Sequence, residues 1–187
     1  MKVIGGQAKG RKLFVPREAQ LRITSDRTKE SLFNILPSVK GKVFLDIFAG
    51  SGNVGIEAMS RGAARVVFVE ENVTMVTAIT KNISSCGFRE KYDVIKKSFD
   101  KGIRLLAKRE ETFDIIFADP PYEKGLVNNA LDTMSKYELI AEGGVIIFEH
   151  SFREKCKEEY ESIVLKDQRR YGDTMLSFFL INCRGRE

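Results

Sequence analysis

Histidine, cysteine and long apolar runs are scarce in this sequence, and each shortage excludes a class of protein. His150 is the only histidine, so a metal cluster built on imidazole is excluded and a Ser-His-Asp relay would depend on this one residue. Cys86, Cys156 and Cys183 are far apart and lack CxxC spacing, which excludes a zinc site and a disulfide framework. Apolar runs such as residues 145–148 are far shorter than the ~20 residues of a membrane span.

The chain also lacks low-complexity tracts, internal repeats and the apolar segment of a signal peptide. Its 187 residues are 43% hydrophobic and 30% charged, which is ordinary for a globular protein. This length fits one domain, or one domain with an appendage. We expect a soluble cytoplasmic protein without a metal site.

Positive charge is concentrated near the N-terminus. Residues 1–42 hold ten Lys and Arg against three acids, a net charge of +7, whereas residues 43–187 hold 21 basic and 23 acidic residues, a net charge of −2. A basic segment beside a slightly acidic body is typical of a chain that contacts a polyanion with one of its parts. The alternative is a basic surface that only aids solubility.

The first 40 residues predict a small extension. Before residue 17, glycines and a proline interrupt two short apolar runs, a pattern typical of short strands or a hairpin. The helical spacing of Thr28, Leu32, Ile35 and Leu36 then predicts a helix that begins at a cap within residues 24–26 and ends at Pro37. We expect this helix to pack on the main body and to carry the N-terminal segment.

From Gly41 onward, apolar runs alternate with helix-like segments such as residues 54–61 and 74–86. This alternation predicts a doubly wound α/β sheet, mostly parallel, with helices on both faces and ligands at the carboxyl ends of the strands. The last two strands, joined across residues 172–173, predict an antiparallel hairpin. The expected strands are residues 43–48, 65–70, 92–96, 113–118, 144–149, 163–166 and 175–182.

A glycine-rich turn follows the first expected strand. Gly50, Gly52 and Gly55 lie where glycine lets the backbone turn sharply and approach a ligand closely. Glu70 ends the next strand, 24 residues after Asp46, close to the spacing at which an acid binds ribose hydroxyls. A nicotinamide dinucleotide would satisfy these features too. Asp46 favours S-adenosylmethionine, because its carboxylate suits an ammonium and a sulfonium but not a pyrophosphate.

The tetrapeptide Asp119-Pro120-Pro121-Tyr122 follows the fourth expected strand. Two consecutive prolines hold the backbone extended, leave their carbonyls as acceptors and remove two N–H groups. Asp119 and the Pro120 carbonyl can accept hydrogen bonds from both N–H groups of an exocyclic amino group, which frees the nitrogen lone pair. Tyr122 can stack on the base. Asp-Pro also marks ordinary turns, but this place in the chain favours methyl transfer to the amino group of a base.

With these motifs, the sequence resembles the RsmD family of bacterial 16S ribosomal RNA guanine-N2 methyltransferases over nearly its whole length. Two positions depart from the family pattern: Ile23 stands where members often have proline, and Tyr122 where many have phenylalanine. A second aromatic residue still allows stacking. The segments that carry the resemblance are residues 10–13, 21–27, 32–34, 46–52, 119–122 and 171–174.

The resemblance implies a class I, Rossmann-like methyltransferase domain over residues 41–187 and a basic RNA-contacting extension over residues 1–40. It also implies S-adenosylmethionine as the donor and, as the target, a guanine amino group of 16S ribosomal RNA within an assembled or assembling small subunit. We expect a monomer. The implied residues are Asp119, Pro120, Pro121 and Tyr122 for catalysis; Asp46, Phe48, Ala49, Gly50, Ser51, Gly52, Glu70, Ser98 and Phe99 for the donor, the last two near its adenine; and Arg11, Arg22 and Arg27 for RNA phosphate.

Three other functions fit part of the pattern. A DNA or RNA adenine-N6 methyltransferase also uses such a tetrapeptide, although the DNA enzymes usually need a separate target-recognition domain, for which little chain is left. An RNA-binding assembly factor with a vestigial donor pocket would not need Asp46, Glu70 and Asp119 intact. A nicotinamide oxidoreductase has no evident use for the tetrapeptide.

Overall fold

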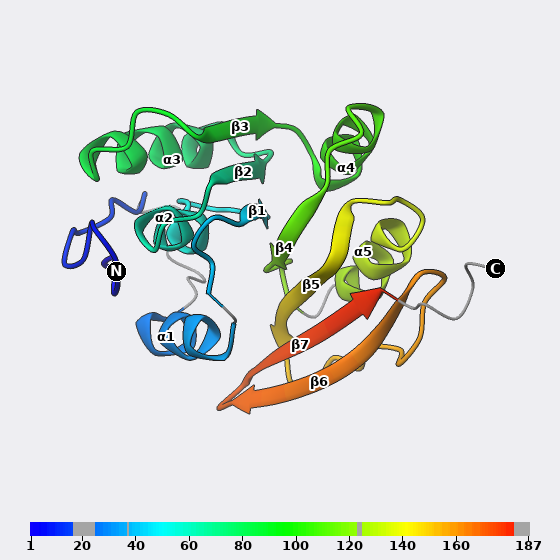
Figure 1. Ribbon diagram of the computed structural model, residues 1–187. Helices are drawn as coiled ribbons and strands as arrows, with labels where there is room; N and C mark the ends of the chain where they lie inside the picture. Colours follow the sequence, from blue (N-terminus) through cyan, green and yellow to red (C-terminus); the bar gives the residue numbers. More distant parts are fainter. Residues whose placement is uncertain (17–24, 37, 123–124, 182–187) are drawn as a thin grey trace.

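One seven-stranded sheet forms the centre of the molecule (Figure 1). The structure, a computed structural model, describes residues 1–16, 25–36, 38–122 and 125–181. The strands are β1 (Val43–Ile47), β2 (Arg65–Glu70), β3 (Tyr92–Lys96), β4 (Phe113–Ala118), β5 (Ile140–Ser151), β6 (Ile163–Tyr171) and β7 (Thr174–Ile181). They lie in the order β3-β2-β1-β4-β5-β7-β6. The first five strands pair in parallel, whereas β7 is antiparallel to both β5 and β6.

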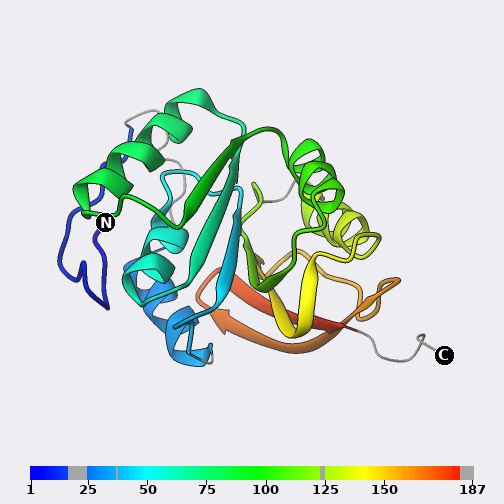
Figure 2. The same ribbon diagram turned by 45° about the horizontal axis from the view of Figure 1, so that its top comes forward.

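Helices cover both faces of this sheet (Figure 2). They are α1 (Asp26–Ile35), α2 (Asn53–Ser60), α3 (Val73–Ser85), α4 (Phe99–Lys108) and α5 (Leu126–Met134). Leu32 of α1, Ile56 of α2 and Ile79 of α3 pack in one apolar cluster, and Ile103 of α4 and Leu131 of α5 pack in the other. In the part of the chain that the structure describes, no helix has the length and apolar content to cross a membrane.

The doubly wound architecture and the C-terminal hairpin predicted from the sequence are confirmed. The predicted bounds of two strands are wrong. β5 and β6 are both longer than the expected ranges 144–149 and 163–166. β6 continues to Tyr171 as an edge strand whose exposed polar residues show no apolar alternation. The N-terminal hairpin consists of a single antiparallel bridge between Lys2 and Lys12. Ser25 caps α1 as expected, while Pro37 lies outside the described residues.

Two buried charged side chains bind the N-terminal segment to α1 and α2. Glu57 of α2, fully buried, accepts hydrogen bonds from the backbone N–H groups of Ile4 and Gly5, each at 2.8 Å. Lys29 of α1, also fully buried, donates to the Lys2 carbonyl at 2.7 Å and lies 3.6 Å from Glu57. Burial lowers the pKa of Lys29, and nearby carboxylates partly offset this effect. The segment therefore packs as one unit with α1 and α2.

The strand order reverses between β1 and β4. From β1 the chain runs outward through β2 and β3, and it then returns to place β4 on the other side of β1. At such a point the loops after the two strands diverge and leave room for a ligand. The fold therefore places a binding site beyond the carboxyl ends of β1 and β4.

Candidate active site

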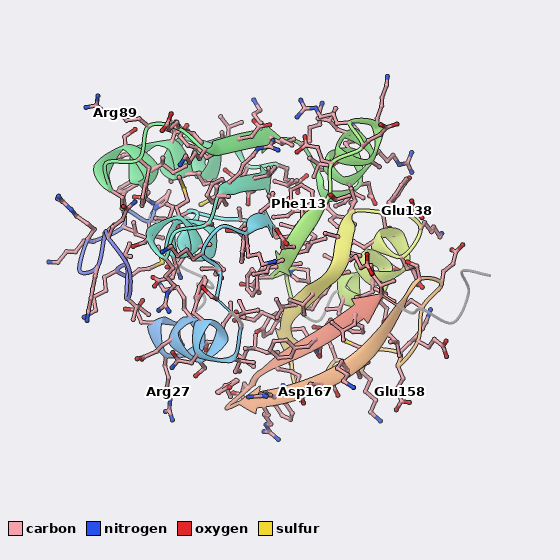
Figure 3. The ribbon with its side chains drawn as sticks, in the orientation of Figure 1. Arg27, Arg89, Phe113, Glu138, Glu158 and Asp167 are labelled. Carbon is pink, nitrogen blue, oxygen red and sulfur yellow. The ribbon has the colours of Figure 1, made fainter. Side chains whose placement is uncertain are left out.

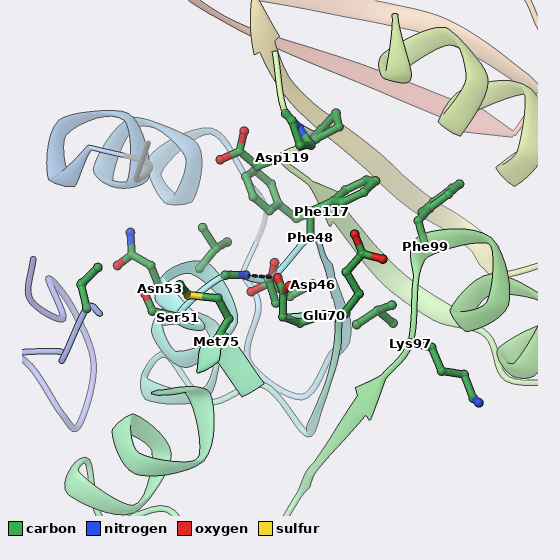
Figure 4. Close-up of a pocket in the computed structure, with 18 of the residues that line it drawn as sticks. Asp46, Phe48, Ser51, Asn53, Glu70, Met75, Lys97, Phe99, Phe117 and Asp119 are labelled. Carbon is green, nitrogen blue, oxygen red and sulfur yellow. Dashed lines mark hydrogen bonds between the residues drawn. The ribbon is translucent and has the colours of Figure 1, made fainter. Parts of the chain in front are cut away.

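A cavity of about 510 Å³ lies at these strand ends (Figure 4). It brings together the two motifs predicted from the sequence, the glycine turn after β1 and the tetrapeptide after β4. The predicted site residues that line it are Asp46, Phe48, Ala49, Gly50, Ser51, Glu70, Phe99, Asp119, Pro120, Pro121 and Tyr122. Gly52 and Ser98 lie just before α2 and α4, as the N-cap residues of these helices.

The glycine turn uses backbone conformations that favour glycine. Gly50 and Gly52 have φ angles of 54° and 83°, in the left-handed region. Gly55 packs closely against β1, since a Cβ atom there would lie 2.9 Å from Asp46 Oδ2. Its N–H donates to that same oxygen at 2.8 Å. The first turn of α2 thus fixes the Asp46 carboxylate with a backbone N–H group.

Asp46 is a buried acid that lies among other acids. Only 2% of the residue is exposed. Burial raises the pKa of Asp46 well above its ordinary value, and the charges of Asp119 and Glu70 raise it further, against the opposing hydrogen bond from Gly55. Lys97 is the one cation among the described lining residues, and its side chain points away from the cavity in Figure 4. The cavity therefore suits a ligand that carries positive charge.

Glu70 joins the glycine turn to the end of β2. Its Oε2 accepts a hydrogen bond from the Gly50 N–H and its Oε1 from the Asn72 N–H, both at 2.8 Å. Each carboxylate oxygen has a further lone pair. The carboxylate is therefore held in place and can still accept hydrogen bonds from a diol.

Two stacked aromatic rings contribute to the wall. The ring centroids of Phe48, after β1, and Phe99, at the start of α4, are 5.3 Å apart, with 14° between the ring planes. Phe48 has a φ angle of 58°, which is unusual for a bulky residue and is a kind of strain that clusters at binding sites. The pair offers an apolar aromatic surface that suits a purine ring.

The tetrapeptide begins directly at the end of β4. The Asp119 N–H donates to the Ile47 carbonyl at 3.4 Å, which joins the ends of β4 and β1. The Asp119 side chain is half-buried, Pro120 is buried and Pro121 is exposed. Asp119 thus lies in the same cavity as Asp46, close enough for its charge to affect the Asp46 pKa.

Tyr122 is held by two further strands. Its hydroxyl lies 3.5 Å from Glu149 Oε1 on β5 and 3.3 Å from Thr174 Oγ1 on β7. Glu149 was not among the predicted site residues. Thr174 ends the segment 171–174, for which the sequence suggested no role beyond family resemblance.

The N-terminal segment also reaches the cavity, which was not predicted. Val15 contributes to the lining. Asn82 of α3, only 1% exposed, accepts a hydrogen bond from the Phe14 N–H at 2.7 Å. Its amide donates to the carbonyls of Phe14 at 2.8 Å and Ser51 at 2.9 Å. A single side chain thus joins the N-terminal segment to the glycine turn.

Sequence reasoning missed several other lining residues. Half of them, Asn53, Val69, Glu71 and Lys97, directly flank a predicted site residue, so that neighbour was the available signal. Met75, in the first turn of α3, had no local signal at all. The missed residues are Val15, Asn53, Val54, Val69, Glu71, Met75, Lys97 and Phe117.

Of the predicted RNA-binding residues, Arg11 and Arg27 are exposed and Arg22 lies outside the described residues. Figure 3 shows the Arg27 side chain pointing away from α1 and from the body of the molecule. Both described arginines are therefore accessible to a large ligand.

Known proteins match this chain over most of its length. A family described as conserved hypothetical protein 95 matches residues 1–180. The Escherichia coli protein named ribosomal RNA small subunit methyltransferase D is 34% identical over 150 residues, which cover 80% of this chain and 74% of that protein. The chain belongs to the RsmD methyltransferase family. YlbH of Bacillus subtilis is 33% identical over 180 residues, which cover 96% of this chain and 98% of YlbH.

The fold agrees with membership of the RsmD family. The solved structure of Escherichia coli yhhF has a TM-score of 0.81 to this chain at 29% identity, and the match covers 96% of each chain. The class I, Rossmann-like methyltransferase fold predicted from the sequence is confirmed. The chain is accordingly a methyltransferase.

Proposed function

We propose that this RsmD-family protein transfers a methyl group from S-adenosylmethionine to the exocyclic N2 amino group of a guanine in 16S ribosomal RNA. The name of the Escherichia coli relative refers to the small-subunit RNA and supports this class of substrate. The observation that carries the proposal is the meeting of an acid-lined pocket and a rigid acceptor tetrapeptide in one cavity.

The cavity fits S-adenosylmethionine by its charge. When bound, this donor supplies a methyl group that its sulfonium has already activated. A positive ligand beside Asp46 offsets the repulsion that Glu70 and Asp119 exert on it. In this proposal Asp46 and residues 48–52 hold the amino acid part of the donor and Glu70 holds the ribose. Ser98 and Phe99 lie beside the adenine, where the Phe48–Phe99 stack supplies an apolar wall.

Asp119 and the Pro120 carbonyl act on the target amino group. Each accepts a hydrogen bond from one N–H of this group. These two bonds draw the nitrogen toward a tetrahedral shape and direct its lone pair into the cavity. Pro121 contributes by keeping this backbone extended. Tyr122, held by β5 and β7, stacks on the base. Positioning of the nitrogen and placement of charge supply the catalysis, so no strong base is required.

RNA phosphate is the proposed ligand of the basic extension. Residues 1–40 form the RNA-contacting part and residues 41–187 the methyltransferase domain, with Arg11, Arg22 and Arg27 as phosphate contacts. The net charge of +7 in residues 1–42 supports this division. We propose that a monomer carries out the reaction in the cytoplasm, on an assembled or assembling small subunit.

One pair of assays tests the proposal against its alternatives. Calorimetric titration with S-adenosylmethionine measures donor binding. Incubation with labelled donor and small subunits from cells that lack the activity measures transfer, with naked 16S RNA and duplex DNA as comparison substrates. We expect binding of the donor and transfer to the subunit. Donor binding without transfer to any substrate would favour the assembly factor, and transfer to DNA alone would favour an adenine-N6 enzyme of DNA.

A further inference from the structure

A basic aromatic cluster lies outside the cavity. Phe152 and Arg153 follow β5, and Arg170 lies near the end of β6. The guanidinium carbon of Arg170 is 3.8 Å from the centre of the Phe152 ring, and that of Arg153 is 5.5 Å from it. Both arginines are exposed and Phe152 is half-buried. We call these three residues the rim cluster.

The turn between β6 and β7 connects the rim cluster to the target side of the active site. The Gly172 carbonyl accepts a hydrogen bond from Arg170 Nε at 2.8 Å, and the Asp173 carbonyl accepts one from the Phe152 N–H at 3.0 Å. Thr174, the next residue, lies 3.3 Å from the Tyr122 hydroxyl. The turn therefore contacts Arg170 and Phe152, and the first residue of β7, directly after it, contacts the tyrosine assigned to the target base.

Arg170 keeps its charge available to a ligand. Its partners in the described part of the chain are a carbonyl and an aromatic ring, and it forms no ion pair there. Arg169 is also exposed, but it forms an ion pair with Asp167 at 2.8 Å. Successive residues of a strand point to opposite faces, so the two arginines face different sides. Arg169 is therefore a matched control for Arg170.

The rim cluster and α1 flank the same side of the molecule. Figures 1 and 2 both place the turn between β6 and β7 beside α1. Arg27 of α1 points outward from the body (Figure 3). Basic groups from two distant parts of the sequence thus lie on the side at which α1 meets the sheet. Asp173 is exposed in the same turn and offsets part of this positive charge.

We propose that the rim cluster binds the RNA strand next to the target guanine, an inference that rests on the proposed function. A guanidinium held against an aromatic ring can donate to phosphate oxygens and can stack on an unpaired base. An enzyme that takes a base out of its stack must also hold the nucleotides beside it. The rim cluster lies within reach of that strand because it packs on the turn that leads directly into Thr174, the β7 residue beside Tyr122.

The test compares salt dependence between variants. Affinity for the unmethylated small subunit is measured over a salt series with wild type, the double variant Arg153→Ala/Arg170→Ala and the control Arg169→Ala. Two lost phosphate contacts should flatten the slope of log affinity against log salt by about 1.4 to 1.8 units. The KM for the subunit should rise while kcat stays unchanged, because these contacts bind substrate and transition state equally. Arg169→Ala should behave as wild type.

Two further measurements exclude a structural effect. Donor titration should give the same affinity in all variants, which confirms an intact fold. Arg153→Lys/Arg170→Lys keeps both charges and should restore the slope. An unchanged slope in the alanine double variant, or an equal change in Arg169→Ala, would overturn the rim cluster as an RNA surface. Absence of methyl transfer by wild type would instead overturn the proposed function, and the binding slopes would still decide the rim cluster.

Discussion

At the scale of single residues, the ionisation of Asp46 is expected to control donor binding. Burial, together with the charges of Asp119 and Glu70, raises the Asp46 pKa in the free protein, and a cation bound beside it lowers that pKa. Binding therefore releases a proton wherever the pH lies between the Asp46 pKa of the donor complex and the higher Asp46 pKa of the free protein. Affinity for S-adenosylmethionine should rise with pH above the ordinary aspartate value of about 3.9. It should level off once Asp46 is ionised in the free protein.

Calorimetric titration in two buffers of different ionisation heat measures this proton release. Asp46→Asn should weaken donor binding by about 1.5–3 kcal/mol, the range for a hydrogen bond to a charged group, and should remove the release. Asp114→Asn is the matched control, because Asp114 lies outside the cavity lining and its pKa is lowered by contacts with Lys42 and Val43. Proton release that persists in Asp46→Asn would assign the titration to another group.

Asp119 is expected to act on the target and not on the donor. Asp119→Ala should lower the single-turnover rate at least about 10²-fold, because the target amino group loses an acceptor. Asp119→Asn should keep part of the rate, since an amide oxygen still accepts one hydrogen bond. Donor affinity, measured by titration, should stay the same or rise slightly at mildly acidic pH, because the Asp46 pKa falls when this charge is removed. An alanine variant that retained most of the rate would contradict the acceptor mechanism.

Residues at strand ends could be predicted because their signals are local. A strand, a glycine turn and a helix follow one another in the sequence around Asp46, and the carboxyl ends of parallel strands meet at one edge of the sheet. Glu70 and Asp119 follow from the same rule. The contact of Tyr122 with Thr174 could not be predicted, because it depends on how β7 pairs with β5, which no local pattern specifies.

At the scale of elements, the N-terminal segment is expected to support the donor cavity through α3. Asn82→Ala would leave the Ser51 carbonyl and both backbone groups of Phe14 without this partner. Each buried group left unsatisfied costs about 1–3 kcal/mol, so the melting temperature should fall. Because Ser51 and Val15 line the cavity, affinity for S-adenosylmethionine should fall as well. Thermal unfolding and donor titration measure the two effects.

A variant on the other face of the sheet separates stability from binding. Tyr160→Phe removes two partly buried hydrogen bonds, from the Tyr160 hydroxyl to Asn128 at 2.6 Å and from the Lys157 N–H to that hydroxyl at 3.1 Å. Tyr160 belongs to the apolar cluster that contains α4 and α5. The variant should lower the melting temperature and leave donor affinity unchanged. If Asn82→Ala lost stability but bound the donor as wild type does, the N-terminal segment would have no influence on the cavity.

Alternating apolar runs predicted the elements, but neither the burial of two charged helix residues nor the polar part of β6 was predicted. Lys29 and Glu57 occupy helical positions where charge usually indicates a solvated face, yet both are fully buried against the N-terminal segment. Their partners are distant in sequence, so no window along the chain contains the signal. β6 extends past its apolar start because an edge strand can carry polar residues on its exposed side.

Across the whole molecule, charge of opposite sign is divided between the cavity and its surroundings. Asp46 and Glu70 place acids in the cavity, which suits a cationic donor. The basic extension, with +7 over residues 1–42, and the rim cluster supply positive charge at the surface, which suits RNA phosphate. Donor and RNA are therefore expected to be drawn to separate parts of one site.

The identity of the methylated nucleoside tests this account most directly. Small subunits from cells lacking the activity are incubated with the protein and labelled S-adenosylmethionine, and the RNA is digested and analysed by mass spectrometry. We predict label in N2-methylguanosine from 16S ribosomal RNA with wild type, and none with Asp119→Ala. Label in N6-methyladenosine, or in no RNA nucleoside, would contradict the account.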